Sequence, residues 1–123
     1  MYNIKTLPVY AVDHLKESAS KEGVKIYKST TKLICMLDDN KVIGFANFKL
    51  YKNKAKMNGL YIEPQHRKKG LGTELTLTRL MILKGMGYKK IEANWDILSV
   101  GLHKNLGAKV INTKNGTSAK LIY

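Results

Sequence analysis

A run of basic residues and glycines near the middle of the sequence carries the clearest chemical signal. The segment 63–75 reads Glu-Pro-Gln-His-Arg-Lys-Lys-Gly-Leu-Gly-Thr-Glu-Leu and separates a β-rich stretch ending at Ile62 from a helical stretch. A helix N-terminus presents unpaired backbone N–H groups and the positive end of the macrodipole, and glycine lets an oxygen approach that backbone closely. Arg67, Lys68 and Lys69 add side-chain charge there. The segment therefore predicts an anion site that suits a pyrophosphate better than a lone carboxylate.

Two better-known phosphate loops do not fit this segment. A Walker A loop requires Gly-Lys-Ser/Thr, whereas Lys69 precedes Gly70 here. A dinucleotide-binding fingerprint requires a third glycine where Leu75 stands. An ordinary strand-to-helix turn with basic surface residues remains an alternative interpretation, because short glycine motifs recur by chance.

The same segment resembles the signature motif of the GNAT acyltransferase superfamily, whose pattern is Arg or Gln, two residues, Gly, one residue, then Gly or Ala. Here it reads Arg67-x-x-Gly70-x-Gly72, preceded by Ile62-x-Pro64. Downstream, the segment 102–108, Leu-His-Lys-Asn-Leu-Gly-Ala, is similar to the family's Leu-Tyr-x-Lys-x-Gly-Phe segment. The resemblance covers about the whole chain, and these two motifs are its specific part.

The resemblance implies an N-acyltransferase that moves an acetyl group from acetyl-CoA to an amine by direct attack on the thioester. It implies that the turn holds the CoA pyrophosphate and that the pantetheine arm lies along the preceding strand, where a backbone N–H polarises the thioester carbonyl as an oxyanion-hole donor. The implied cofactor-binding residues are Leu60, Tyr61, Ile62, Arg67, Lys68, Lys69, Gly70, Leu71, Gly72 and Thr73.

Acyl transfer to an amine calls for a base and an acid. Family members often place a tyrosine acid where this chain has His103, and histidine can also donate a proton near neutral pH. Glu92 is the first candidate for the base, because a carboxylate early in the fifth strand occurs in acetyltransferases of the ribosomal-protein type. Glu63, Asp96 and a water chain are alternatives, and Asp96 also suits a helix N-cap. His103 could instead be a partly exposed helix residue, and Glu92 a surface residue of an edge strand.

The apolar pattern around the motif predicts an α/β fold with a mixed, mostly antiparallel central sheet of about six to seven strands and interleaved helices. Strands are expected at 24–27, 32–37, 42–51, 56–62, 90–95, 108–112 and 118–123, and helices from Pro8 to about Gly23, from Gly70 to about Met86 and from Asp96 to Gly107. The second and third of these strands are expected to form one hairpin and the last two another.

The helix after the motif connects two strands, so one strand pair is expected to be parallel. Its buried face is expected to comprise Leu71, Leu75, Leu80, Met81, Leu83 and Met86.

The bulk composition predicts one domain over residues 1–123, because 44% apolar residues suffice for one core in a chain of this length. No segment has the roughly 20 apolar residues of a membrane-spanning helix, and the N-terminus lacks a secretion signal, so we expect a cytoplasmic protein without membrane attachment. The single Cys35 lies in an apolar run and predicts a buried, inert thiol. The histidines are scattered without ligand spacing, so no metal site is expected.

The net charge of +13 points to anionic partners. The excess is spread evenly, since residues 1–62 carry 11 basic and 5 acidic side chains and residues 63–123 carry 11 and 4. Charge of this sign disfavours a cationic acceptor such as a polyamine or an aminoglycoside. We therefore expect an anionic or nucleic-acid-associated acceptor: a ribosomal or nucleic-acid-bound protein, a charged tRNA or DNA.

Two other classes of function remain open at this point. One is a GNAT-like module, non-catalytic or modifying DNA or RNA, that binds nucleic acid through its basic surface. The other is a generic nucleotide-phosphate site, at which ATP would compete with CoA. An exposed strand edge or an apolar patch could also support a homodimer.

Overall fold

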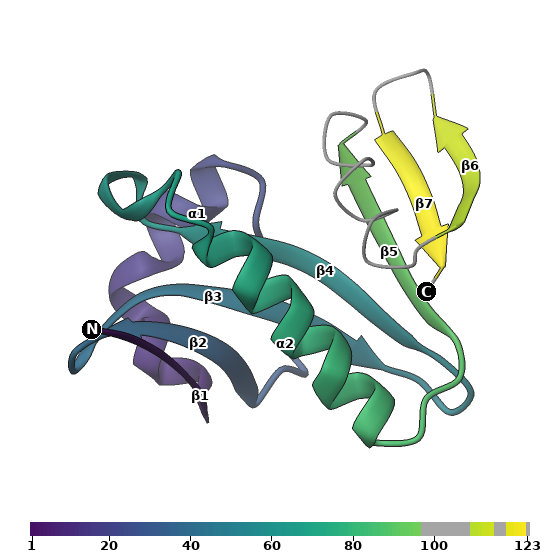
Figure 1. The fold of residues 1–123 in the computed structure, drawn as a ribbon, viewed down its shortest axis with the longest axis horizontal. Helices are drawn as coiled ribbons and strands as arrows, with labels where there is room; N and C mark the ends of the chain where they lie inside the picture. The colour runs from purple at the N-terminus through teal and green to yellow at the C-terminus, as the bar shows by residue number, and fades with distance from the viewer. Residues whose placement is uncertain (97–108, 115–117, 123) are drawn as a thin grey trace. The chain divides into compact units, whose positions relative to one another are not determined.

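The computed structural model describes residues 1–96, 109–114 and 118–122. Within these ranges, seven strands form one mixed sheet with the order β1-β2-β3-β4-β5-β7-β6 (Figure 1). The predicted α/β fold is confirmed. The chain divides into two compact units: unit 1 comprises Met1–Phe48 and Asn58–Arg79, and unit 2 comprises Lys49–Met57 and Leu80–Tyr123. Strand β4 (Ala55–Ile62) and helix α2 (Leu71–Gly85) each contribute residues to both units.

Unit 1 is built on three antiparallel strands, β1 (Tyr2–Pro8), β2 (Lys32–Asp38) and β3 (Lys41–Leu50). The turn between β2 and β3 confirms the predicted hairpin, and Asp39 adopts a φ of 54° there. Aspartate tolerates this left-handed conformation better than most residues. The strands that lead to the motif are therefore positioned by local turn chemistry.

The predicted strand at 24–27 is wrong. This segment has no strand pairing; the N–H of Val24 donates to the carbonyl of Ala19 (2.9 Å), and the amide of Asn47 donates to the carbonyl of Lys25 (2.7 Å). The place beside β2 is taken by β1, which the sequence analysis left without an assignment. Val24 and Ile26 nevertheless pack against the core, which accounts for their alternating pattern.

The helix expected from Pro8 to Gly23 is present in two parts, the 3₁₀ helix η1 (Val9–Leu15) and helix α1 (Lys16–Lys21). Gly23, with a φ of +81°, follows the end of α1. Both helices cover one face of the unit 1 strands, and the first part of α2 covers the other (Figure 1). The core on the η1 and α1 side contains Val12, Leu15, Ala19, Leu33, Cys35, Leu37, Val42, Phe45 and Tyr61.

Helix α2 agrees closely with the predicted helix, but its buried face differs from the prediction. Four of the predicted residues, Leu71, Leu75, Leu80 and Leu83, are buried. Met81 is 63% exposed because the helical period turns it away from these leucines, and Met86 is 53% exposed because it lies beyond the last residue of the helix. Thr76 and Arg79 occupy buried positions instead.

Unit 2 contains β5 (Ile91–Asp96), β6 (Lys109–Lys114) and β7 (Ser118–Ile122). The start of β4 pairs in parallel with β5, from Ala55 opposite Ile91 to Met57 opposite Ala93, which confirms the predicted parallel pair. Strand β7 pairs antiparallel with both β5 and β6, so the last hairpin is confirmed and its second strand lies next to β5. The helix expected between Asp96 and Gly107 lies outside the described residues.

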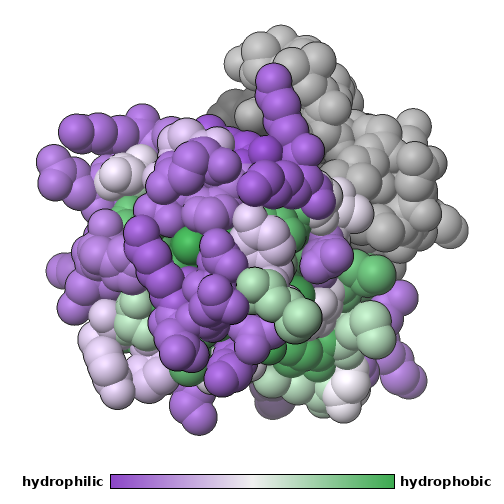
Figure 2. Space-filling model, turned by 60° about the vertical axis from the view of Figure 1, so that its left-hand side comes forward, coloured by the Kyte–Doolittle hydropathy of each residue, from purple (hydrophilic) through white to green (hydrophobic). Residues whose placement is uncertain are grey.

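The visible surface of the described residues is mainly hydrophilic, with apolar side chains in smaller groups between polar ones (Figure 2). Among the helices in these ranges, none is both long and apolar enough to cross a membrane.

Candidate functional site

The basic, glycine-containing turn lies between β4 and α2 in unit 1, at the place that the sequence predicts. A short 3₁₀ helix, η2 (Pro64–His66), follows β4, and Lys68 and Gly70 then adopt positive φ angles of 64° and 78°. The carbonyl of Gly70 accepts the N–H of Glu74 (3.1 Å), which closes the first turn of α2. The N–H groups of the first helical residues, from Leu71 onward, consequently have no acceptor within the helix. The turn thus presents backbone donors.

The backbone of this turn is accessible. A Cβ atom built on Gly70 would have no heavy atom within 4 Å, and one built on Gly72 would meet only Leu60 Cδ2 at 3.6 Å. The space above both glycines is therefore open to a ligand's oxygen atoms. The exposed side chains of Lys68 and Lys69 flank it. Donors, room and positive charge together fit a pyrophosphate group.

Arg67 ties this turn to the rest of unit 1. Its Nε donates to the carbonyl of Ile62 (2.8 Å), and its Nη2 donates to both carboxylate oxygens of Glu22 (2.7 Å each). The guanidinium also lies 5.5 Å from the ring centroid of Tyr61. The positive charge of Arg67, which was predicted to contact an anion, is thus paired with the carboxylate of Glu22. Arg67 joins the end of β4 to the end of α1.

A chain of polar side chains supports Lys69, and the sequence analysis missed its central member, Tyr2. Lys69 Nζ donates to Tyr2 Oη (3.2 Å), which is hydrogen-bonded to His66 Nδ1 (2.9 Å). His66 Nε2 lies 4.0 Å from Glu63 Oε1, and Lys41 Nζ lies at the same distance from that oxygen. Glu63, an alternative base, therefore belongs to the framework of the turn. No spacing in the sequence could have linked Tyr2 to a motif more than 60 residues away.

The end of β4 is fixed against β3 by a close backbone approach. A Cβ atom on Gly44 would lie 2.5 Å from the carbonyl oxygen of Tyr61 and 2.6 Å from Ile62 Cδ1. Only glycine fits there without displacing the strand. The N–H of Glu63 continues the contact by donating to the carbonyl of Ile43 (2.8 Å). Tyr61 and Ile62 are 3% and 6% exposed, so the predicted pantetheine strand is held rigidly.

Arg79 forms a hydrogen bond to Gly59, the residue just before the segment from Leu60 to Ile62. It is fully buried in α2, and its Nη1 donates to the carbonyls of Asn47 (2.7 Å) and Gly59 (2.8 Å). Gly59 has a φ of +70°, so Arg79 fixes an irregular point in β4 immediately before Leu60. An arginine within the apolar face of a predicted helix was the signal that could have identified it.

Glu92 is a buried residue of unit 2. It is 2% exposed and lies on β5, between β4 and β7, so the interpretation as a surface residue of an edge strand is wrong. Its two carboxylate oxygens lie 3.5 Å from Lys54 Nζ and 3.5 Å from Lys90 Nζ. The structure therefore places Glu92 in an ion-paired setting. His103, the other predicted proton carrier, lies outside the described residues.

Cys35 is buried, and its burial raises the pKa of its thiol to about 11. The thiol is therefore neutral and unreactive near pH 7, as predicted. In the part of the chain that the structure describes, no group of three or more His, Cys, Asp or Glu residues is arranged to hold a metal ion.

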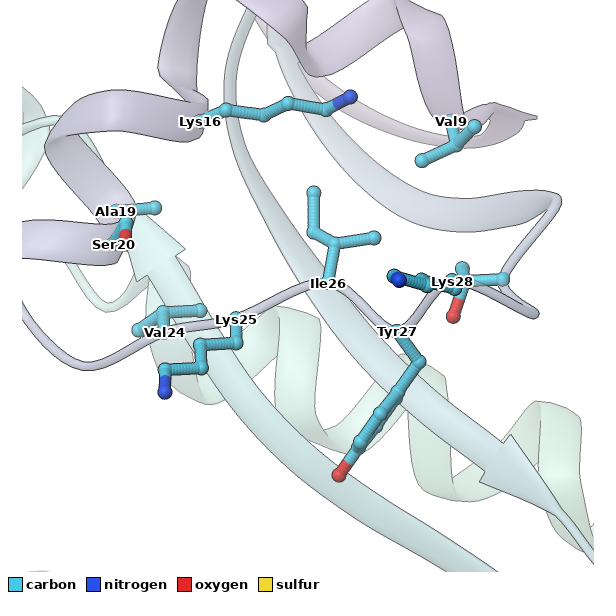
Figure 3. Close-up of a pocket in the computed structure, with 10 residues that line it drawn as sticks. Val9, Lys16, Ala19, Ser20, Val24, Lys25, Ile26, Tyr27 and Lys28 are labelled. Carbon is cyan, nitrogen blue, oxygen red and sulfur yellow. The ribbon is translucent and has the colours of Figure 1, made fainter.

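Unit 1 also contains an open cavity of about 470 Å³ beside α1 (Figure 3). Ile26 points toward the space between α1 and Val9, whereas Tyr27 points the opposite way. Val24, which lines the cavity, lies 3.0 Å from the position of a Cβ atom on Gly59, so the cavity borders β4. The lining combines apolar residues with basic and hydroxyl groups: Val9, Lys16, Ala19, Ser20, Val24, Lys25, Ile26, Tyr27, Lys28 and Thr30.

The sequence model of the acetyltransferase (GNAT) family matches residues 4–108 of this chain, which is most of its length. The chain belongs to this family. The match includes the turn described above and the β4 segment before it. No curated protein sequence matches this GNAT chain.

Solved structures show the same fold at low sequence identity. The PaiA N-acetyltransferase of Thermoplasma acidophilum in complex with coenzyme A has a TM-score of 0.74 and 18% identity, over 98% of each chain. NAA60 of Arabidopsis thaliana in complex with acetyl-CoA has a TM-score of 0.78 and 9% identity, over 100% of this chain and 99% of the other. The ribosomal-protein-S18-alanine N-acetyltransferase of Escherichia coli has a TM-score of 0.74 and 16% identity, over 99% and 91%.

Proposed function

We propose that this GNAT chain transfers an acetyl group from acetyl-CoA to an amine acceptor that is part of, or bound to, an anionic partner. The observation that carries the proposal is the open turn from Arg67 to Thr73, which combines accessible glycine backbone, a helix N-terminus and two flanking lysines. Neighbouring structures that contain coenzyme A or acetyl-CoA support the choice of ligand.

The proposed reaction is direct attack on the thioester. The acceptor nitrogen forms a bond to the carbonyl carbon, the carbon–sulfur bond breaks, the amine loses a proton and the CoA thiolate gains one. A backbone N–H in the segment from Leu60 to Ile62 would stabilise the negative charge that develops on the carbonyl oxygen. The rigid support of this segment by Gly44 and Arg79 favours such a role, because a donor must be held in place before charge develops.

Glu92 and His103 remain our proposed proton carriers. Glu92 would accept the proton of the amine, either directly or through a water molecule, and His103 would donate one to the leaving thiolate. The two lysines beside Glu92 offset the free-energy cost of burying its carboxylate, since a buried carboxylate requires a positive partner.

The cavity beside α1 is the proposed acceptor side of the enzyme. Lys16, Lys25 and Lys28 line it, so acidic groups near the acceptor nitrogen would be attracted and a polyamine repelled. Its apolar floor, which includes Val24 and Ile26, would contact the carbon atoms of a short peptide segment. A protein N-terminus followed by acidic residues has both properties.

Acetyl transfer can be tested by following release of the free CoA thiol. The acceptors would be two peptides with the same N-terminal alanine, one followed by Asp and Glu and the other by Lys and Arg. We expect turnover with the acidic peptide and at least tenfold lower kcat/KM with the basic one. Glu92→Gln should lower kcat by about 100-fold, the scale of general-base catalysis. Glu17→Gln, which changes an exposed carboxylate on α1, should leave turnover unchanged.

Two outcomes would contradict the proposal. Absence of turnover with every peptide, in a folded protein that binds acetyl-CoA, would favour the non-catalytic module. Equal kcat/KM for the two peptides would contradict the assignment of an acidic acceptor to the lysine-lined cavity.

A further inference from the structure

The positive charge of the molecule is unevenly divided between the two units. Unit 1 contains 11 Lys and Arg against 7 Asp and Glu, a net charge of +4 over its residues. Unit 2 is shorter and contains 11 Lys against 2 Asp and Glu, a net charge of +9. Basic residues are spread evenly along the sequence, but the fold concentrates the excess positive charge in unit 2.

Part of this charge surrounds a single aromatic ring at the turn between β3 and β4. The ammonium groups of Lys49, Lys54 and Lys56 lie 5.4, 5.5 and 5.9 Å from the ring centroid of Tyr51. The segment 49–57 contains no acidic residue, and Tyr51 is 38% exposed. Lys54 Nζ also lies 3.5 Å from Glu92, which pairs with Lys90 as well, so one carboxylate serves two lysines. The lysines of unit 2 outnumber its carboxylates, and this excess of positive charge would attract a row of phosphate groups.

A groove of about 520 Å³ opens within the same unit, and its size lies in the range of small-ligand pockets. Lys52 and Lys89 contribute charge to its lining. Tyr88 contributes an aromatic ring, and its hydroxyl donates to the carbonyl of Tyr51 (3.2 Å), so the groove adjoins the lysine-ringed turn. The full lining is Leu50, Lys52, Asn53, Met86, Gly87, Tyr88 and Lys89.

We propose that this lysine surface of unit 2, formed by the segment 49–56 and by Tyr88, Lys89 and Lys90, binds single-stranded nucleic acid. The lysines track the phosphate backbone, and the groove receives an unstacked base against the ring of Tyr88. Lysine clusters combined with aromatic platforms are the recognition chemistry of single-stranded nucleic acid. An acidic protein segment would satisfy the charge but carries a flat ring only at its aromatic residues, whereas every nucleotide carries a base that could enter the groove.

This inference does not rest on the proposed acetyl transfer, because the acetyl-CoA turn and the α1 cavity consist of other residues. Lys54 and Lys90 are also the ion-pair partners of Glu92, and the test variants leave both of these lysines unchanged. It does give the enzyme a means of reaching an acceptor on a nucleic-acid-bound partner. Binding of nucleic acid and binding of acetyl-CoA can be measured separately, so failure of one proposal leaves the other intact.

The test measures the fluorescence anisotropy of a labelled 12-nucleotide oligouridylate RNA as the full-length protein is added. The surface variant is Lys52→Glu, Lys56→Glu and Lys89→Glu together. Its matched control is Lys5→Glu, Lys28→Glu and Lys32→Glu in unit 1, which changes the net charge by the same amount at exposed positions. Circular dichroism checks that both remain folded.

We expect the surface variant to bind the RNA at least roughly 30-fold more weakly and its salt slope to fall by about 2, since three phosphate contacts are lost. The control should lose less than about threefold through long-range charge alone. Equal losses in both variants would overturn the proposal, because net charge rather than this surface would then determine binding. Acetyl-CoA affinity of the surface variant should not change.

A second variant separates base recognition from charge. Tyr88→Leu keeps every lysine and removes the ring, and stacking of one base predicts a loss of roughly tenfold. Unchanged affinity in Tyr88→Leu, or equally effective competition by a polyglutamate peptide of the same charge, would show a general polyanion surface and overturn the assignment. Tighter binding of a duplex than of the single strand would overturn it as well.

Discussion

The thiol of Cys35 gives a pH-dependent test of the unit 1 core at the scale of a single residue. Burial raises its pKa from near 9 to about 11. Below pH 9 the thiol is protonated in both the folded and the unfolded chain and contributes nothing to the pH dependence. Between these two values only the unfolded chain releases the proton, so the free energy of unfolding should fall by about 2 kcal/mol as the pH rises.

Urea unfolding at pH 8 and pH 10.5 measures this effect. Cys35→Ala is the reference, because lysine and tyrosine also titrate in that range and their contribution is common to both proteins. The wild type should lose about 2 kcal/mol more than the variant between the two pH values. An equal loss in both proteins would contradict the buried position of the thiol.

At the scale of single residues, local features of the site could be predicted from the sequence and long-range contacts could not. The motif glycines and the position of the turn could be predicted, because both depend on local backbone chemistry. The partners of Arg67, Lys69 and Arg79 could not, because Glu22, Tyr2 and Gly59 are distant in the sequence and meet the motif only in the folded chain. The residues that support the site are therefore those that the sequence left unassigned.

Among the elements, the contact between β3 and β4 should be the most sensitive to added volume. A methyl group at Gly44 would overlap the carbonyl oxygen of Tyr61, a backbone atom that cannot move without displacing β4. Gly85, at the end of α2, has no heavy atom within 4 Å of the same added group and has no positive φ. The two glycines make a matched pair for one substitution.

Gly44→Ala should lower the free energy of unfolding by about 2 kcal/mol or more, as in an overpacked core. Gly85→Ala should raise it by about 0.5 to 1 kcal/mol, because alanine loses less chain entropy in a helix. Chemical denaturation measures both values. Similar stability of the two variants would show that β4 does not lie against Gly44 as described.

Most strands and helices could be predicted because their periodic patterns reflect local burial. The exception at 24–27 is instructive: Val24 and Ile26 alternate because they pack against the core beside α1, and pairing plays no part. The edge strand β1 has a weaker pattern, since Asn3, Lys5 and Thr6 are exposed. Strand β1 is therefore defined by its hydrogen bonding to β2, which its own sequence pattern does not predict.

For the whole molecule, the family and the α/β fold could be predicted from two motifs and the order of elements. The division of charge could not, because it depends on which segments of the chain share a unit. The net charge of +13 favours an anionic partner, and the +9 of unit 2 is the reason that we propose its lysine surface as a binding site for nucleic acid.

We propose that the turn at the start of α2 binds acetyl-CoA through its backbone. Isothermal titration of acetyl-CoA tests it in the wild type, in Gly72→Glu and in Gly85→Glu, which places the same side chain at the opposite end of the same helix. We predict binding to the wild type and to Gly85→Glu, and a loss of at least roughly 100-fold in Gly72→Glu, where bulk and negative charge occupy the phosphate position. Absence of binding to the folded wild type, or equal binding to all three proteins, would contradict the account.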